Sequence, residues 1–244
     1  MNYHRNNAYC RRAGILFIAL IFGTARYTDA QTVLLHVDRS TDSLASKHGP
    51  NLHSYIFPFL KFGWVAGSDA TGARIKYGSS VDMALGMRKK YKAGSVYSAG
   101  WDIQLNYQVF KLRQDSGKIV PNNILNKTER IDFSSLRIGL FNRFNFDPGR
   151  GNIIGKYMDI GVTAEWCYVV KNITKNDLPD GSYVKAEAKN QPYYTDLNAY
   201  GDIRIGTNRI ALYGTYRFTD VFRPRFNFPE LPRINIGLEL SLGN

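Results

Sequence analysis

The stretch Arg74-Ile-Lys-Tyr-Gly-Ser-Ser-Val-Asp-Met-Ala-Leu-Gly-Met-Arg88 alternates apolar and polar residues. Its polar parity includes Arg74, Lys76, Asp82 and Arg88, and Ser79 alone interrupts the apolar parity. Successive side chains of a β-strand point to opposite faces, so the stretch predicts a strand with one apolar and one charged face. Its length exceeds that of most strands in soluble proteins. The apolar parity consists of Ile75, Tyr77, Val81, Met83, Leu85 and Met87.

Similar alternation recurs in seven further stretches of the chain. The first of them, residues 54–66, is the poorest case because it is apolar on both parities and Pro58 cannot donate a ladder hydrogen bond. Long alternating strands behind an export signal are typical of barrels that span an outer membrane. We therefore predict an all-β, eight-stranded, antiparallel, transmembrane up-and-down β-barrel. Its strands are expected near residues 54–66, 74–88, 97–112, 131–146, 154–170, 193–206, 209–219 and 233–242.

The N-terminus carries the pattern of an export signal. Arg11 and Arg12 precede an apolar run, and Thr28-Asp-Ala30 places small residues before a cleavage site. The alternative is a membrane anchor, but the run is shorter than the roughly 18 residues that a spanning helix needs. We predict a signal peptide over residues 1–30, a periplasmic segment over 31–53 and the barrel over 54–244.

The chain of 244 residues has a formal net charge of +12. Excess positive charge can indicate nucleic-acid binding. Behind an export signal it favours anionic head groups instead, so we expect outer-membrane lipid and lipopolysaccharide as partners, and no nucleic acid. The mature chain keeps only Cys167, which predicts that the fold contains no internal disulfide.

The connections between the predicted strands alternate in length. The long ones cover residues 113–130, 171–192 and 220–232, while residues 89–96 and 147–153 are short. Outer-membrane barrels have short periplasmic turns and longer external loops, so both termini are predicted to be periplasmic.

Aromatic residues chosen by parity and strand direction fall into two groups, as expected for girdles at two membrane interfaces. A soluble β-sandwich or lipocalin-like barrel, the alternative fold, would bury them inside. The predicted external girdle contains Trp166, Tyr168, Tyr193, Tyr216 and Phe218, and the periplasmic one Tyr97, Trp101, Phe144 and Phe146.

On these features the chain resembles the small outer-membrane β-barrels of Bacteroidota, a porin-like or PorT-like group. The resemblance rests on the signal ending at Ala30-Gln31, the strand pattern and the closing segment Arg233-Ile-Asn-Ile-Gly-Leu-Glu-Leu-Ser-Leu242. It implies an accessory subunit of an outer-membrane export, assembly or uptake machine. Many such barrels end on an aromatic residue, whereas this chain ends Leu242-Gly-Asn244.

The inward parity predicts a charge network in the lumen. An eight-stranded barrel has an interior only wide enough for side chains, and buried charges must be paired. We therefore predict a salt-bridged plug, with a proton or small-ion path as the alternative. The predicted network comprises Arg74, Asp82, Asp102, Arg137, Arg143, Asp159, Glu165, Asp202, Arg204, Arg217 and Glu239.

Residues suited to catalysis are poorly placed. Barrel enzymes generally need a histidine base or paired carboxylates near the outer rim. His36, His48 and His53 all precede the first strand, and only Asp196 with Glu165 offers a rim pair. We predict no catalytic, metal or cofactor site and a non-enzymatic structural or interaction role. A lipid-modifying enzyme and a narrow solute channel are the alternatives.

The last external loop, Arg223-Pro-Arg-Phe-Asn-Phe-Pro-Glu-Leu-Pro232, combines prolines with aromatic and basic residues. Proline lowers the entropy lost on binding, and Phe and Arg are frequent interface anchors. The loop is a candidate site for a protein partner in the outer membrane or periplasm; a rigid loop folded over the barrel mouth is the alternative. The candidate contacts are Arg223, Arg225, Phe226, Phe228 and Leu231.

Overall fold

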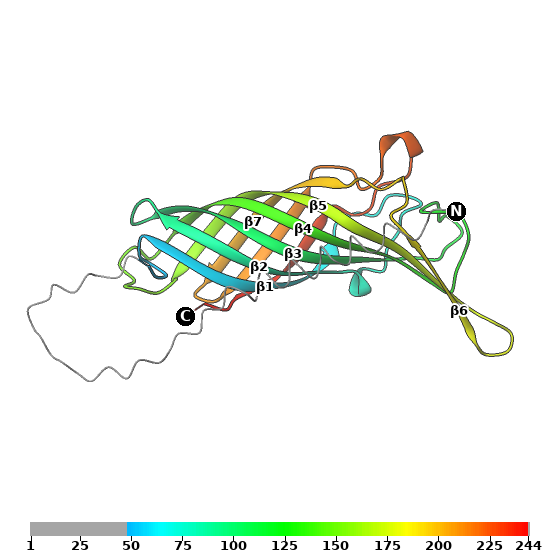
Figure 1. Cartoon of the computed structure of the whole chain (residues 1–244), viewed down its shortest axis with the longest axis horizontal. Helices are drawn as coiled ribbons and strands as arrows, with labels where there is room; N and C mark the ends of the chain where they lie inside the picture. The colour runs from blue at the N-terminus through cyan, green and yellow to red at the C-terminus, as the bar shows by residue number, and fades with distance from the viewer. Residues whose placement is uncertain (1–47, 244) are drawn as a thin grey trace, which may run out of the picture. The chain divides into compact units, whose positions relative to one another are not determined.

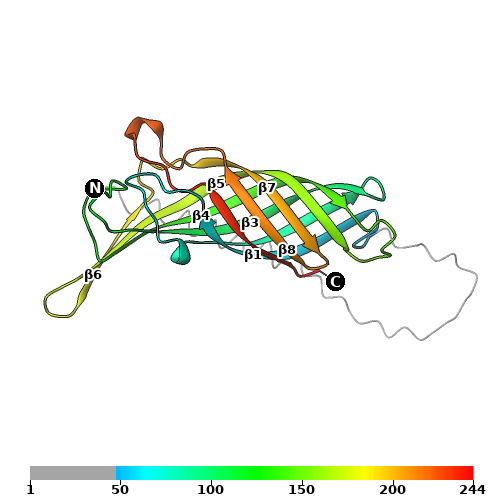
Figure 2. The ribbon, with the colours of Figure 1, turned by 180° about the vertical axis from the view of Figure 1, so that it is seen from behind.

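The computed structural model describes residues 48–243, in which nine strands form one antiparallel sheet. Eight of them close into a barrel because β1 pairs with both β2 and β9, and β4 pairs with both β3 and β5 (Figures 1 and 2). The predicted all-β, closed, eight-stranded antiparallel barrel is confirmed. No helix in the described part of the chain is long and apolar enough to cross a membrane. The strands are β1 Ser54–Ala66, β2 Val81–Lys92, β3 Tyr97–Leu112, β4 Thr128–Asn145, β5 Lys156–Asp177, β6 Tyr183–Lys189, β7 Leu197–Thr207, β8 Ile210–Arg217 and β9 Ile234–Ser241.

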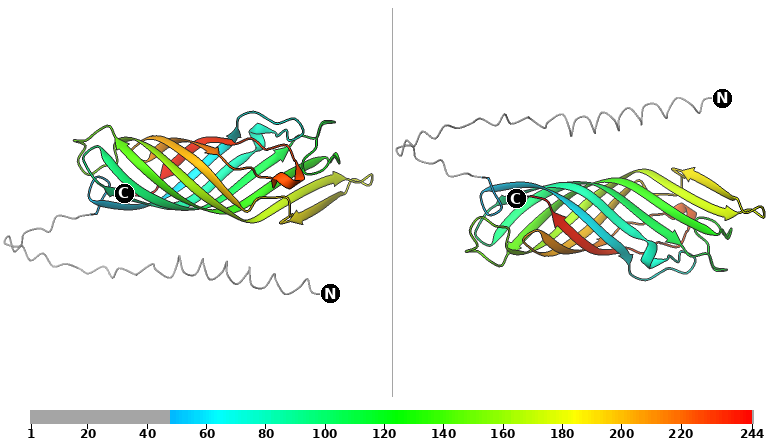
Figure 3. Two further views of the ribbon diagram at one scale, coloured as in Figure 1. Left: turned by 90° about the horizontal axis from the view of Figure 1, so that it is seen from above. Right: turned by 90° about the horizontal axis from the view of Figure 1, so that it is seen from below.

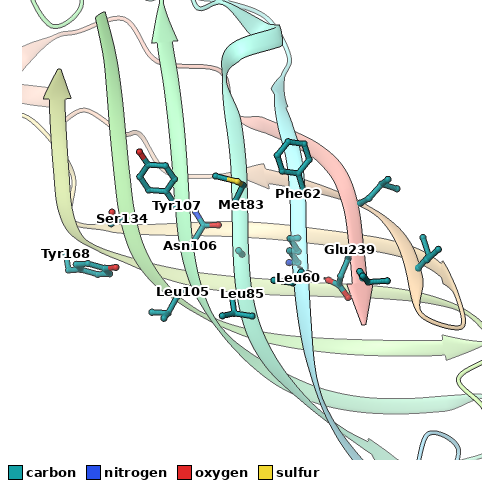
Figure 4. A pocket seen from close by; sticks show the side chains of 15 residues that line it. Leu60, Phe62, Met83, Leu85, Leu105, Asn106, Tyr107, Ser134, Tyr168 and Glu239 are labelled. Atoms are coloured by element: carbon teal, nitrogen blue, oxygen red, sulfur yellow. Dashed lines mark ion pairs between the residues drawn. The ribbon is translucent and has the colours of Figure 1, made fainter. Parts of the chain in front are cut away.

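Sequence alternation becomes an apolar outside and a polar inside. Leu85 of β2 pairs with Leu60 of β1 and Leu105 of β3, and these three side chains line up on the outer surface (Figure 4). They are 40–52 % exposed, whereas Asp82 and Arg88 of the opposite parity are fully buried. The same period of two that identified the strands therefore sorts side chains between exterior and lumen.

The first half of the stretch 74–88 does not form a strand. Strand β2 begins only at Val81. Gly78, Ser79 and Ser80 break the apolar pattern, and a 3-10 turn, η1 (Tyr77–Ser79), replaces the predicted strand. The prediction that Ile75 and Tyr77 face outward from a strand is therefore wrong. Ile75 is 1 % exposed, and the Tyr77 hydroxyl donates to Asp69 Oδ1 at 2.5 Å. Burial and this hydrogen bond raise the pKa of Tyr77 to about 12.

The region predicted as a loop over residues 171–192 contains a hairpin. Strand β5 continues past the barrel to Asp177 and pairs with β6, which lies at the end of the sheet order (Figure 3). The hairpin and the 3-10 turn η2 (Pro224–Phe226) lie at the end of the barrel opposite the end of β9 (Figures 1 and 2). A register shift at Ser134/Ser135 on the β4–β5 ladder reverses which residues of β5 face outward beyond that point. The alternation of the first part of β5 therefore does not continue into its extension.

The predicted signal peptide, residues 1–30, and residues 31–47 of the predicted periplasmic segment lie outside the described residues. Residues 48–53 fold against the turn end of the barrel. Lys90 Nζ donates to the Pro50 carbonyl, and Asn51 Nδ2 donates to the Gly151 carbonyl at 2.6 Å. These contacts hold the start of the described chain against β2 and the β4–β5 turn.

Candidate functional site

Ten charged side chains lie in the middle of the lumen, which we call the lumen charge layer. Each is at most 5 % exposed. Five are cationic and five anionic, so the layer is electrically balanced. A buried charge is costly unless it is paired and hydrogen-bonded, which makes balance a requirement for folding. The layer consists of Lys61, Arg88, Arg137, Arg143, Arg204, Asp82, Asp102, Asp159, Glu165 and Glu239.

One half of the layer centres on Arg88 and Arg204. Arg88 makes a two-point contact with Glu239, with Nη2 3.0 Å from Oε2, and its Nε lies 3.2 Å from Asp102 Oδ2. Arg204 of β7 reaches across the lumen to Asp102 of β3 at 3.2 Å. Its Nε also lies 3.2 Å from Asp159, which receives both Nε and Nη2 of Arg143 at 2.7 and 2.9 Å. Arginine forks therefore link strands that are not neighbours in the sheet.

The other half of the layer centres on Arg137 and Glu165. Arg137 Nε donates to Glu165 Oε1 at 2.8 Å, and Nη1 lies 3.4 Å from Asp82 Oδ1. Glu165 also accepts hydrogen bonds from Ser135 Oγ at 2.6 Å and from the Tyr200 hydroxyl at 2.8 Å. Both oxygens of the Glu165 carboxylate are therefore engaged in contacts within the lumen.

Eight of the eleven predicted network residues belong to the layer: Asp82, Asp102, Arg137, Arg143, Asp159, Glu165, Arg204 and Glu239. Of the other three, Arg74 and Arg217 lie elsewhere, while Asp202 shares the inward parity of β7 with Tyr200 and Arg204 but is less deeply buried. Arg74 lies at the loop end with half of its side chain exposed, 3.6 Å from Asp115. Arg217 is buried near the rim and pairs with Glu230 at 2.6 Å. Asp202 is half-buried and accepts from Thr163 Oγ1 at 2.5 Å.

Lys61 is a lumen residue that the sequence pattern did not predict. Its Nζ lies 3.9 Å from Glu239 Oε2 and 5.2 Å from the centre of the Tyr213 ring. Strand β1 is apolar on both parities, so alternation gave no direction for its side chains. Lys61 is the only charged residue of β1. Because a charged side chain facing lipid is costly, its presence in an otherwise apolar strand indicates that this position faces the lumen.

Two apolar clusters lie above and below the lumen charge layer. At the turn end, Tyr55, Phe57, Ile154, Tyr157 and Ala211 pack together. At the loop end a larger group, the rim cluster, combines barrel and loop residues. It consists of Val65, Ala73, Ile75, Phe110, Leu112, Val120, Ile131, Phe133, Cys167, Val170, Tyr194, Val221, Phe222 and Leu231.

Aromatic rings join the loops to the strands inside the rim cluster. The Tyr194 ring lies 5.5 Å from that of Phe133 and 5.6 Å from that of Phe222, in edge-to-face and stacked geometry. Burial raises the pKa of the Tyr194 hydroxyl well above its ordinary value. A buried apolar core thus lies at the loop end. Tyr193, predicted on the outward girdle, packs against this core instead, because β7 begins only at Leu197.

The candidate partner loop folds over the barrel mouth. Leu231 is 1 % exposed in the rim cluster, and Phe228 packs against that cluster. Arg223 Nη2 lies 2.9 Å from Asp196 Oδ2. Arg225 alone stays fully at the surface, with its guanidinium 4.8 Å from the centre of the half-buried Phe226 ring. Of the five candidate contacts, Arg225, the half-buried Phe226 and the partly exposed Arg223 offer surface that a partner could reach.

The residues considered for chemistry are dispersed. Asp196 pairs with Arg223 on the outside and Glu165 lies within the lumen, so they do not form a rim dyad. His48 Nδ1 lies 2.7 Å from Ser54 Oγ at the turn end. No group of three or more His, Cys, Asp or Glu within residues 48–243 could hold a metal ion.

Comparisons with known proteins add little to this geometry. No family model and no curated protein matches the chain. Among solved structures, the chain is similar to Ail, the attachment invasion locus protein of Yersinia pestis, in complex with the heparin analogue sucrose octasulfate. The identity is 7 %, the match covers 76 % of this chain and 94 % of that chain, and the TM-score is 0.32. A similarity at that score supports no conclusion about function. By its own geometry, the chain is a closed eight-stranded barrel with a filled interior.

Proposed function

We propose that this protein spans the outer membrane as a non-conducting, non-enzymatic β-barrel with a structural or interaction role. The observation that carries the proposal is a ring of exposed apolar side chains, the apolar belt, around a charged and filled lumen. Soluble monomers rarely expose apolar patches beyond a few hundred Å². A closed barrel also satisfies its backbone hydrogen bonds in lipid. Every barrel strand contributes an exposed apolar side chain to the belt: Leu60, Leu85, Leu105, Leu140, Val162, Ile203, Leu212 and Leu238.

Aromatic side chains at both margins of the apolar belt support the membrane assignment. Trp166 and Phe218 are exposed toward the loop end, and Trp101 and Phe146 toward the turn end. Such rings favour membrane interfaces, where one part meets lipid and another meets water. A lipocalin-like protein would place its apolar residues in the lumen, which here holds ion pairs.

We further propose that residues 1–30 are a cleaved signal peptide and that both termini are periplasmic. The longer connections and the β5–β6 hairpin lie at the opposite end, which corresponds to the outside of the cell in known outer-membrane barrels.

An interaction role is supported by apolar side chains beyond the belt. Ile124 and Leu125 are 62 % and 55 % exposed at the loop end, and Tyr183 of β6 is 67 % exposed. Asn176 Nδ2 donates to Asn126 Oδ1 at 2.8 Å, which holds this loop against the hairpin. Exposed apolar groups outside a lipid belt are typical of contact surfaces. With the resemblance to PorT-like barrels of Bacteroidota, they support an accessory subunit of an export, assembly or uptake machine.

Cross-linking from single cysteines on intact cells tests orientation and partnership together. We expect Ile124→Cys and Asp180→Cys to react with a membrane-impermeant, biotinylated, photoactivatable thiol reagent. Gly149→Cys, also exposed but at the turn end, should stay unlabelled until the cells are opened. After illumination, Ile124→Cys should give a discrete heavier adduct with one protein. Labelling at 149 with protection at 180 would invert the orientation, and the absence of any adduct from 124 would argue against a partner at this surface.

A further inference from the structure

An unusual arrangement of like charges covers the outward face of the β3–β6 sheet above the apolar belt. Six cations share this surface, the basic face: Lys111, Arg130, Lys171, Lys175, Lys185 and Lys189. Three pairs of them are direct cross-strand partners: Lys111 with Arg130, Lys171 with Lys189, and Lys175 with Lys185. Like charges directly opposite each other destabilise a sheet, so three such pairs require an explanation.

Carboxylates within the protein offset only part of this charge. Glu187 alone serves Lys171, Lys185 and Lys189, at 3.5, 4.0 and 3.4 Å. Asp132 lies 3.3 Å from Arg130 and also accepts the Tyr107 hydroxyl at 2.9 Å. For Lys111 and Lys175, no carboxylate of the described chain lies within ion-pair distance. The two carboxylates against six cations leave a net charge of +4 on the basic face, and the neighbouring Lys127–Asp177 ion pair adds no net charge.

The cations without a full partner surround a groove. Lys111, Arg130 and Lys175 line a hollow of about 480 Å³ together with Tyr183. Two carboxylates also line it, and both are already paired: Asp177 with Lys127, and Glu129 with Lys118. Val109 and Ile173, only 8 % and 5 % exposed, also line it. The groove thus combines donors for an anion with apolar surface.

The groove continues the surface that faces lipid. On β3 the outward parity runs from Leu105 in the apolar belt through Tyr107 and Val109 to Lys111. At about 3.3 Å per residue, Lys111 lies roughly 20 Å along the strand from Leu105. Because strands are tilted in a barrel, the rise along its axis is smaller, which places the basic face at the level of membrane head groups.

We propose that the basic face binds the phosphate groups of lipopolysaccharide in the outer leaflet. This inference rests on the proposed membrane-spanning function and names a partner for it. A phosphate would supply the negative charge that Lys111 and Lys175 lack, and Arg130 would add paired donors. The continuity with the apolar belt favours a phosphate carried by a membrane lipid over a soluble polyanion, because the acyl chains would lie along Leu105 and its neighbours.

Titration of lipopolysaccharide into the folded full chain in zwitterionic micelles tests the proposal. Lys111→Gln with Lys175→Gln should weaken binding roughly 10- to 30-fold, since each basic residue near an anionic surface contributes on the order of one decade or less. The matched control, Lys89→Gln with Lys156→Gln, removes the same charge at the turn end and should stay within about twofold of the unmodified protein. Lipopolysaccharide stripped of phosphate should bind all three proteins weakly and alike.

Equal affinity of the three proteins for intact lipopolysaccharide would overturn the inference. Binding of a soluble polyphosphate as tightly as lipopolysaccharide would also overturn it, in favour of a soluble polyanion. Insertion into lipopolysaccharide-free phospholipid liposomes is measured on the same samples. A barrel that inserts but ignores phosphate contradicts only this inference, whereas a barrel that binds phosphate but never inserts contradicts the proposed function.

Discussion

Replacing Arg88 by alanine should lower the free energy of unfolding by about 3–5 kcal/mol, more than most single substitutions do. The Arg88 side chain is fully buried and contacts both Glu239 and Asp102. It also packs over the Phe59 ring, with 4.3 Å between the guanidinium carbon and the ring centre. Without it, two buried carboxylates lose a counter-charge.

Urea unfolding from micelles, followed by heat-modifiable gel mobility, gives the comparison. Arg113→Ala removes an exposed arginine and should change stability by less than about 0.5 kcal/mol. The double variant Arg88→Ala with Glu239→Gln should lose less than the sum of the two single variants, because the residues are coupled. Similar losses for Arg88→Ala and Arg113→Ala would show that the lumen charge layer does not stabilise the barrel.

Leu105→Arg should destabilise the inserted barrel by about 2–4 kcal/mol, because it places a charge near the middle of the apolar belt. Leu105 lies between Leu85 and Leu136 in the register and is 40 % exposed. Phe218→Arg, at the margin of the belt, should cost only about 0–1 kcal/mol. Folding yields in liposomes measure both. Equal tolerance at the two depths would contradict the membrane assignment.

The barrel could be predicted from the sequence because residues that alternate along a strand place their side chains alternately in the lumen and on the outer surface. The prediction failed where another rule decided the structure. At residues 74–80 the Gly-Ser-Ser run favoured a turn, and Ile75 went to the rim cluster. At residues 171–189 the apolar parity of β6 consists only of Val184 and the small Ala186 and Ala188, so the hairpin lacks the strong apolar signal of the barrel strands.

The lumen charge layer was predictable as a set but not as a list of pairs. Parity placed Asp102 and Arg204 inside, yet their contact joins β3 to β7 across the lumen and depends on how the closed barrel brings distant strands together. The rim cluster was not predictable at all. Its members come from four strands and several loops, and loop positions follow from tertiary packing rather than from local patterns.

Electrical recording across a planar bilayer tests the central claim, that this membrane barrel is closed by its own side chains. Protein inserted from micelles, with insertion verified by protease protection, should produce no current steps above those of the bare bilayer. That result is expected because the lumen charge layer is packed between two apolar clusters. Reproducible unitary steps from fully folded protein would contradict the account and make a narrow channel the better description.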